Sequence, residues 1–240
     1  LLKFCPFPVV AGLRNADLDN VAEIRKLAVV FIKFDSYDVK SHRDLLSLQV
    51  ILRACQDTIH EAGGFIRQFI VDDKGCVLIA CWGVPSASFI DNSARALSSS
   101  VDIHKSLNKL GMQCSFGIST GWGYCGCVGP ERRPEYAAIG DIVNLAARLM
   151  GKAKGGIIID QSTHDAIPDM SDRLSALEPM KVKGKDEPIQ AYSYELESVR
   201  SRTSFKSEAM AKIMLSPEQL YEVHAALTID TSERNNYFSY

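Results

Sequence analysis

The order in which strand-like and helix-like patterns follow one another most constrains what this chain can fold into. Continuous apolar runs and alternating apolar residues are typical of strands, whereas apolar residues spaced three and four apart predict amphipathic helices. Two strand-like runs joined by a turn sequence rich in Asp and Gly predict a hairpin. The predicted elements are a strand at Leu27–Phe34, a helix at Asp44–Ile59, a hairpin of Phe65–Val71 and Cys76–Trp82, a helix at Asn92–Leu110 and a strand at Met112–Thr120.

This strand-helix-strand-strand-helix-strand order is the split βαβ pattern of ferredoxin-like folds. We therefore predict an α+β fold with a ferredoxin-like βαββαβ core, in which helices pack on a largely antiparallel sheet. The absence of strict strand-helix alternation argues against a doubly wound parallel sheet. Additional strands are predicted at Tyr124–Val128, Tyr136–Ile139, Ile157–Asp160 and Pro188–Glu195, and a third helix at Ile142–Met150.

Changes in composition divide the chain into three parts. Residues 1–25 contain two early prolines and are interpreted as a lead-in from a preceding domain. Residues 26–196 hold the predicted core and its additions. Residues 197–240 begin with a polar, Arg/Ser-rich linker, and Ser216-Pro217 is a strong helix start. We expect this last part to include the start of a following helical region.

Composition excludes several classes of protein. With 27 basic and 29 acidic residues the net charge is −2, so the basic excess typical of nucleic-acid binders is missing. No apolar run approaches the ~18 residues that a membrane span needs. The 7 cysteines are irregularly spaced without a C-x-x-C pair, which argues against a structural zinc site. We expect free thiols, and hence a reducing, cytoplasmic compartment.

A glycine-rich segment at Gly121–Gly126 matches the pattern G-x-G-x-x-G. A dinucleotide-binding fingerprint must also open a helix, and the following residues 127–130, Cys-Val-Gly-Pro, do not favour one. The glycines are better explained by tight hairpin turns or by close approach of another backbone.

Two polar residues of the third predicted helix, Asn144 and Arg148, lie four apart and therefore share a face. The other positions are largely apolar, so we expect this helix to be mostly buried. A buried guanidinium needs an anion. The spacing leaves open whether that anion is a carboxylate of the protein or a phosphate of a ligand.

The stretch Arg133–Arg148 closely resembles the signature of class III nucleotidyl cyclase homology domains. Three further motifs agree in order: Gly117–Gly121 with the glycines that follow it, Gly63-Gly64 before a hairpin that ends at Trp82-Gly83, and Val182–Lys185. The resemblance covers about residues 26–196. The turn at Asp73–Cys76 and the Pro-rich lead-in look most like the second catalytic domain of bicarbonate-responsive soluble adenylyl cyclases.

In this family two domains pair head to tail and form composite sites at their interface. One domain supplies two aspartates that hold two Mg²⁺ or Mn²⁺ ions, and the other supplies an Asn and an Arg. The ribose 3′-oxygen attacks the α-phosphorus and pyrophosphate leaves, a reaction that two metal ions suit. The resemblance implies that Asn144 orients the ribose, Arg148 stabilises charge on the phosphate, Lys74 reaches the purine and Lys185 contacts the terminal phosphates.

The chain departs from the family pattern at three positions. Lys33 and Cys76 stand where the resemblance places the metal aspartates, and neither is a good Mg²⁺ ligand. Asp35 and Asp72 lie nearby but are better interpreted as solvated turn carboxylates. The base-reading position is Ala137, whose side chain makes no hydrogen bond, so the choice between ATP and GTP stays open.

The sequence thus predicts the second-type half of an adenylyl cyclase. It would bind ATP and act with a metal-bearing first-type domain, expected earlier in the same polypeptide. The chain alone, or as a homodimer, should make no cyclic nucleotide. The alternatives are a catalytically inactive dimerisation or regulatory module, and a structural part of a larger assembly such as a cilium, where this family also occurs.

Overall fold

The computed structural model describes residues 8–10, 22–37, 45–72, 75–85, 87–130, 135–181 and 187–196. Contacts divide the chain into units at residues 1–201 and 202–240, and all the described residues belong to the first. The strands are β1 (Glu23–Phe34), β2 (Phe65–Asp72), β3 (Gly75–Trp82), β4 (Cys114–Val128), β5 (Glu135–Ile139), β6 (Ile157–Asp160), β7 (Leu174–Ala176) and β8 (Ala191–Tyr194). The helices are α2 (Leu45–Glu61), α3 (Asn92–Lys109), α4 (Asp141–Lys152), α5 (Gln161–Asp165) and the 3₁₀ helix η3 (Pro168–Arg173).

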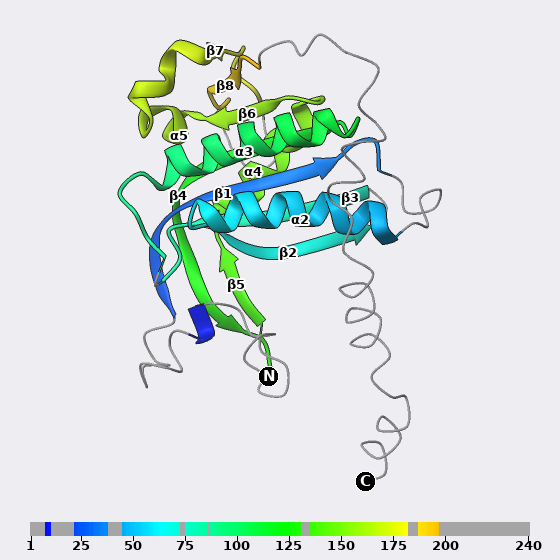
Figure 1. The fold of residues 1–240 in the computed structure, drawn as a ribbon. Helices are drawn as coiled ribbons and strands as arrows, with labels where there is room; N and C mark the ends of the chain where they lie inside the picture. The colour runs from blue at the N-terminus through cyan, green and yellow to red at the C-terminus, as the bar shows by residue number, and fades with distance from the viewer. Residues whose placement is uncertain are drawn as a thin grey trace. The chain divides into compact units, whose positions relative to one another are not determined.

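The strands form one 8-stranded sheet in the order β2-β3-β1-β4-β6-β8-β7, with β5 paired to β4 (Figure 1). Strand β1 lies between β3 and β4 and is antiparallel to both, and β4 and β6 are parallel. The chain order β1-α2-β2-β3-α3-β4 is the predicted ferredoxin-like pattern. The α+β fold class is confirmed.

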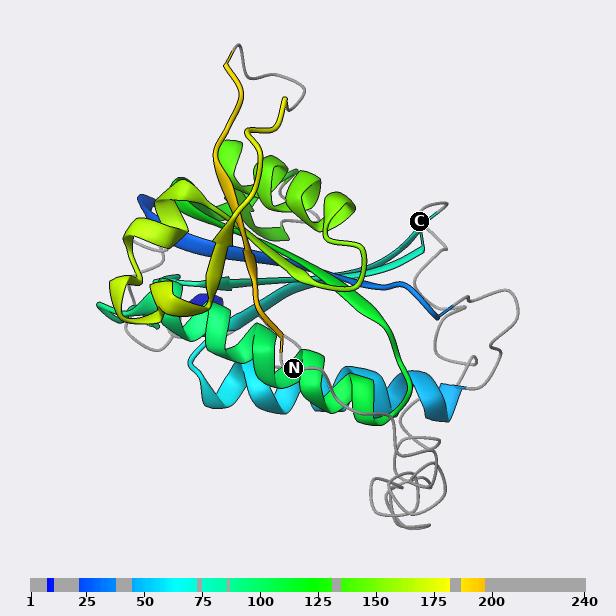
Figure 2. The same ribbon diagram turned by 90° about the horizontal axis from the view of Figure 1, so that it is seen from above.

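Helices cover both faces of the sheet. Figure 2 shows α2 and α3 on one side and α4 on the other. The alternation of side chains along β1 explains both layers. Ala28 and Val30 join the core under α2 and α3, whereas Leu27 and Val29 join a second core that includes Ile142 and Ala146 of α4. The strand is apolar on both faces because both are packed.

The structure corrects the predicted turn in the glycine-rich segment. Residues 114–128 form a single continuous strand, so the glycines at 121 and 123 do not make a hairpin. The alternative, close approach of another backbone, applies to Gly123, where an added Cβ would lie 3.3 Å from the carbonyl oxygen of Ile139, whereas Gly121 faces the side chain of Ile142. The short elements α5, η3 and β7 were not predicted, because none is long enough to display a periodicity.

Candidate functional site

Two glycines of β4 seat helix α4 directly on the sheet. A Cβ atom at Gly117 would lie 2.1 Å from the carbonyl oxygen of Ala146 and 2.2 Å from the backbone nitrogen of Met150. One at Gly121 would lie 2.7 Å from the side chain of Ile142. Since real Cβ atoms do not approach so closely, the glycine positions set the distance between α4 and β4.

This seating turns the polar side of α4 away from the sheet. Ile142, Ala146 and Leu149 are buried, while Asn144 is exposed and Arg148 is half-buried. The expectation that the helix is mostly buried is therefore wrong. Among the described residues no carboxylate forms an ion pair with Arg148. Because its guanidinium is positively charged and only half-buried, it is available to an anionic ligand.

Lys33 and Cys76, which the resemblance places at the positions of metal aspartates, do not form a metal site in the described part of the chain. Lys33 Nζ lies 3.6 Å from Asp35 Oδ1, and Ser115 Oγ donates a hydrogen bond of 2.5 Å to Asp35 Oδ2. Cys76 pairs with Phe34 and is fully buried on the α2 and α3 side, so it lies on the opposite face from Lys33. An ammonium and a buried thiol are not donors that suit Mg²⁺.

The remaining predicted site residues are only partly described. Ala137 lies on β5 opposite Gly126 and is 2 % exposed, and its methyl group offers no hydrogen bond. Lys74 and Lys185 lie outside the described residues, as do Cys5 and the side chain of Asp72. The other 6 cysteines are free thiols, of which only Cys127 is exposed.

A buried polar cluster that sequence analysis missed lies at the start of α5. Asp160 is 5 % exposed and accepts hydrogen bonds from Ser119 Oγ at 2.7 Å, from Thr163 Oγ1 at 2.5 Å and from two backbone N–H groups, those of Thr120 and Thr163. Burial raises the pKa of the Asp160 carboxyl, and these hydrogen bonds oppose the shift. An Asp after a short apolar run, three residues before a Thr, is the available sequence signal for this helix cap.

Two features are absent from the part of the chain that the structure describes. It holds no group of three or more His, Cys, Asp or Glu side chains placed to hold a metal ion. No helix in it is long and apolar enough to cross a membrane.

Comparison with known proteins identifies the architecture. Residues 6–196 match the family model described as the adenylate and guanylate cyclase catalytic domain. The chain belongs to this cyclase family. The match extends to the N-terminal side of the predicted start at residue 26.

Curated relatives agree with the family assignment. The cyclase domain is 30% identical over 154 residues to adenylate cyclase type 10 of Oryctolagus cuniculus, covering 60% of this chain and 9% of that protein. It is 28% identical over 212 residues to the adenylate cyclase of Anabaena cylindrica, covering 79% of this chain and 40% of that protein. The chain thus spans less than half the length of these relatives.

Solved structures share the fold. The adenylyl cyclase CyaB from P. aeruginosa superposes with a TM-score of 0.63 at 25% identity, over 75% of this chain and 97% of that one. The catalytic core of a rhodopsin–guanylyl cyclase with converted specificity, in complex with ATPαS, superposes with a TM-score of 0.64 at 22% identity. That superposition covers 73% of this chain and 98% of that core.

Proposed function

We propose that this chain is the second-type half of an adenylyl cyclase, which converts ATP to cAMP and pyrophosphate in a composite site with a partner domain. The observation that carries the proposal is the outward face of α4. Asn144 is exposed on it and Arg148 is half-buried, and no described carboxylate pairs with the guanidinium.

The roles proposed for these two side chains follow from their chemistry. Asn144 would hydrogen-bond the ribose and fix the direction of its 3′-oxygen. As that oxygen loses its proton and bonds to the α-phosphorus, the bond to the pyrophosphate oxygen breaks and negative charge grows on the phosphate. Arg148 would bind that charge through its planar fork of N–H donors. Lys74 and Lys185 remain the proposed contacts to the purine and to the terminal phosphates.

The metal ions would belong to the partner. Since Lys33 is paired with Asp35 and Cys76 is buried on the other face, the residues of this chain do not fit Mg²⁺ or Mn²⁺. A first-type cyclase domain, which we place in the same polypeptide, would supply the aspartates. We place the assembly in the cytoplasm.

The test is cyclic nucleotide synthesis by this chain alone and together with the segment that precedes it in its natural polypeptide. We expect cAMP only from the pair, and a loss of at least about a hundredfold for Arg148→Ala. Arg53→Ala is the matched control, because Arg53 lies on α2 in an exposed ion pair with Asp57. Unchanged turnover in Arg148→Ala would refute the proposal, and activity of the chain alone would refute the metal assignment.

Ala137→Thr tests which base the site accepts. Ala137 is 2 % exposed in this chain, so the test presupposes that pairing with the partner domain uncovers it; a threonine hydroxyl would then hydrogen-bond adenine where the alanine methyl cannot. We expect the ratio of cAMP to cGMP made by the pair to rise. An unchanged ratio would mean that residue 137 does not face the base.

A second candidate is a catalytically inactive module that pairs with another cyclase domain and regulates it, or serves a structural role in an assembly such as a cilium. The ion pair of Lys33 with Asp35 at a metal position favours this candidate. Calorimetry with ATP and Mg²⁺ on the paired domains separates the two. Binding without product supports the inactive module, and cAMP formation excludes it.

A further inference from the structure

A hollow of about 290 Å³ opens on the opposite side of β4 from helix α4. Its walls come from four elements that are distant in sequence: the start of β1, the middle of β4, the start of α3 with the loop before it, and the end of α5. Its volume is just below the range of about 300–1,000 Å³ typical of small-molecule sites, so it suits a small ligand. The residues that the argument uses are Lys26, Phe89, Ile90, Ser93, Trp122 and Ala166.

Strand pairing places a cation beside an aromatic ring in this hollow. Lys26 of β1 lies directly opposite Trp122 of β4 in the antiparallel ladder, so their side chains share a face. Lys26 is exposed, and no described residue forms an ion pair with it. Trp122 is 70% exposed, although tryptophan is highly buried on average.

The floor of the hollow is polar and fixed. Thr120 follows on the same face of β4, and its Oγ1 lies 3.1 Å from Ser93 Oγ and 2.9 Å from Thr163 Oγ1, the hydroxyl that donates its proton to Asp160. Ser93 and Thr120 are buried and both line the hollow. These hydroxyls are held in place by the cluster around Asp160, so a ligand would meet a preorganised surface.

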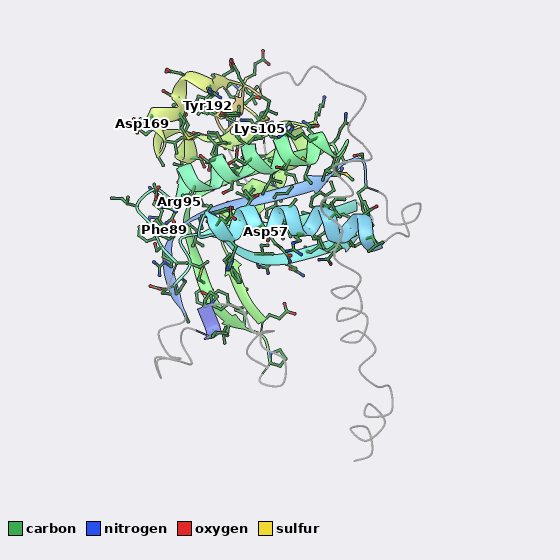
Figure 3. The ribbon with its side chains drawn as sticks, viewed as in Figure 1. Asp57, Phe89, Arg95, Lys105, Asp169 and Tyr192 are labelled. Atoms are coloured by element: carbon green, nitrogen blue, oxygen red, sulfur yellow. The ribbon has the colours of Figure 1, made fainter. Side chains whose placement is uncertain are left out.

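Apolar side chains of the loop before α3 form one wall of the hollow. Phe89 and Ile90, in the loop before α3, line the hollow, and both are among the exposed large apolar residues. The Arg95 guanidinium stacks over the Phe89 ring, 3.9 Å from its centroid, and also pairs with Asp91 at 2.7 Å. Figure 3 shows Arg95 and Phe89 side by side at this end of the molecule. The loop is therefore anchored rather than free to fold away.

We propose that this hollow binds a small aromatic anion, whose ring packs between Trp122 and the Phe89–Ile90 wall and whose charged group binds Lys26. A ring explains an exposed tryptophan that lines the same hollow as two exposed apolar side chains. A negative group explains a lysine at the same opening without a carboxylate partner among the described residues. The site lies on the face of the sheet opposite α4, so it is separate from the proposed nucleotide site.

The fluorescence of Trp122 can report binding in the hollow. Of the chain's 2 tryptophans, Trp82 is fully buried and Trp122 lines the hollow. Phenyl phosphate is the probe, and inorganic phosphate and benzyl alcohol carry its charge and its ring separately. Titration of the full chain with phenyl phosphate should quench tryptophan emission saturably, and Trp122→Phe should abolish the quenching. Saturation-transfer NMR measures binding without relying on tryptophan.

Lys26→Ala should weaken phenyl phosphate binding about tenfold, as expected for loss of a charge-assisted contact. Lys109→Ala, at the exposed far end of α3, is the charge-matched control. Ala166→Leu should block binding by filling the hollow, since Ala166 is an exposed lining residue with helical backbone angles that any side chain accepts. Arg148→Ala should bind the probe like the wild type whether or not the proposed cyclase function holds.

Three results would overturn the proposal. The first is the absence of saturable binding to a chain that melts cooperatively. The second is equal weakening by Lys26→Ala and Lys109→Ala, which would assign the effect to net charge. The third is equal binding of inorganic phosphate and phenyl phosphate, which would remove the aromatic ring from the ligand class.

Discussion

The His104 side chain connects helix α3 to the turn between α4 and β6. Its Nε2 lies 3.0 Å from the carbonyl oxygen of Gly155, and its ring centroid lies 6.0 Å from that of Phe116. Burial lowers the pKa of His104 below its usual 6.5, and the hydrogen bond to Gly155 only partly offsets this. The folded protein therefore favours the neutral ring.

This shift predicts how stability depends on pH. As the pH falls below 6.5, the unfolded state takes up a proton at His104 before the folded state does, so the free energy of unfolding decreases. His104→Gln should flatten this dependence between pH about 7.5 and about 5.5, measured by urea denaturation. His60→Gln, on an exposed residue of α2, is the control and should leave the slope unchanged. An identical slope in His104→Gln would contradict the assignment.

The buried hydrogen bonds of Asp160 allow a second prediction at the residue scale, about the free energy of unfolding. Its replacement by Ala removes four hydrogen bonds and leaves their buried donors unsatisfied. We expect Asp160→Ala to lower the free energy of unfolding by about 3–5 kcal/mol. Asp165→Ala removes an exposed carboxylate five residues along the chain and should leave the denaturation midpoint near the wild-type value. A midpoint for Asp160→Ala close to that control would contradict the prediction.

At the scale of elements, the packing of α4 on β4 can be tested with two glycines. Gly117→Ala places a methyl group within 2.2 Å of the α4 backbone, so the helix must move, and we expect a loss of about 3 kcal/mol or more. Gly151, in α4 itself, has nothing within 4 Å of an added Cβ, so Gly151→Ala should stabilise the protein by about 0.5–1 kcal/mol. Thermal and urea unfolding of both variants measure the contrast. Equal effects would show that α4 is not held at this distance.

The elements also show what the sequence can predict. The apolar periodicity of residues 27–34, 44–59 and 92–110 was sufficient to place β1, α2 and α3 within a few residues. The continuity of β4 was not predictable, because the glycines at 121 and 123 weaken the strand pattern locally. These positions need to be small because they pack against Ile142 of α4, about twenty residues further along the chain. In the site, the four-residue spacing placed Asn144 and Arg148 on one face, but their exposure depends on which face of α4 meets the sheet.

At the scale of the whole molecule, one sheet packed on both faces predicts a gradient of local stability. Ala28, Val29 and Val30 of β1 are each 0% exposed and lie between two partner strands, whereas β7 is a three-residue edge strand in which two of the side chains are exposed. Native-state hydrogen exchange should be slowest in β1 and the paired part of β4, with protection close to the global unfolding free energy. Amides of β7 should exchange much faster. Equal protection in β7 and β1 would show that the sheet opens only as a unit.

The glycines beneath α4 have a consequence for substitution over evolutionary time. Part of the signature by which this family is recognised is imposed by steric fit, since Gly117 and Gly121 must stay small whether or not the domain turns over a nucleotide. A lineage that loses catalysis would therefore keep those glycines, whereas exposed Asn144 would be free to change. If the proposed shared site is correct, selection on Asn144 and Arg148 acts through the ligand, whereas selection on the two glycines acts through packing.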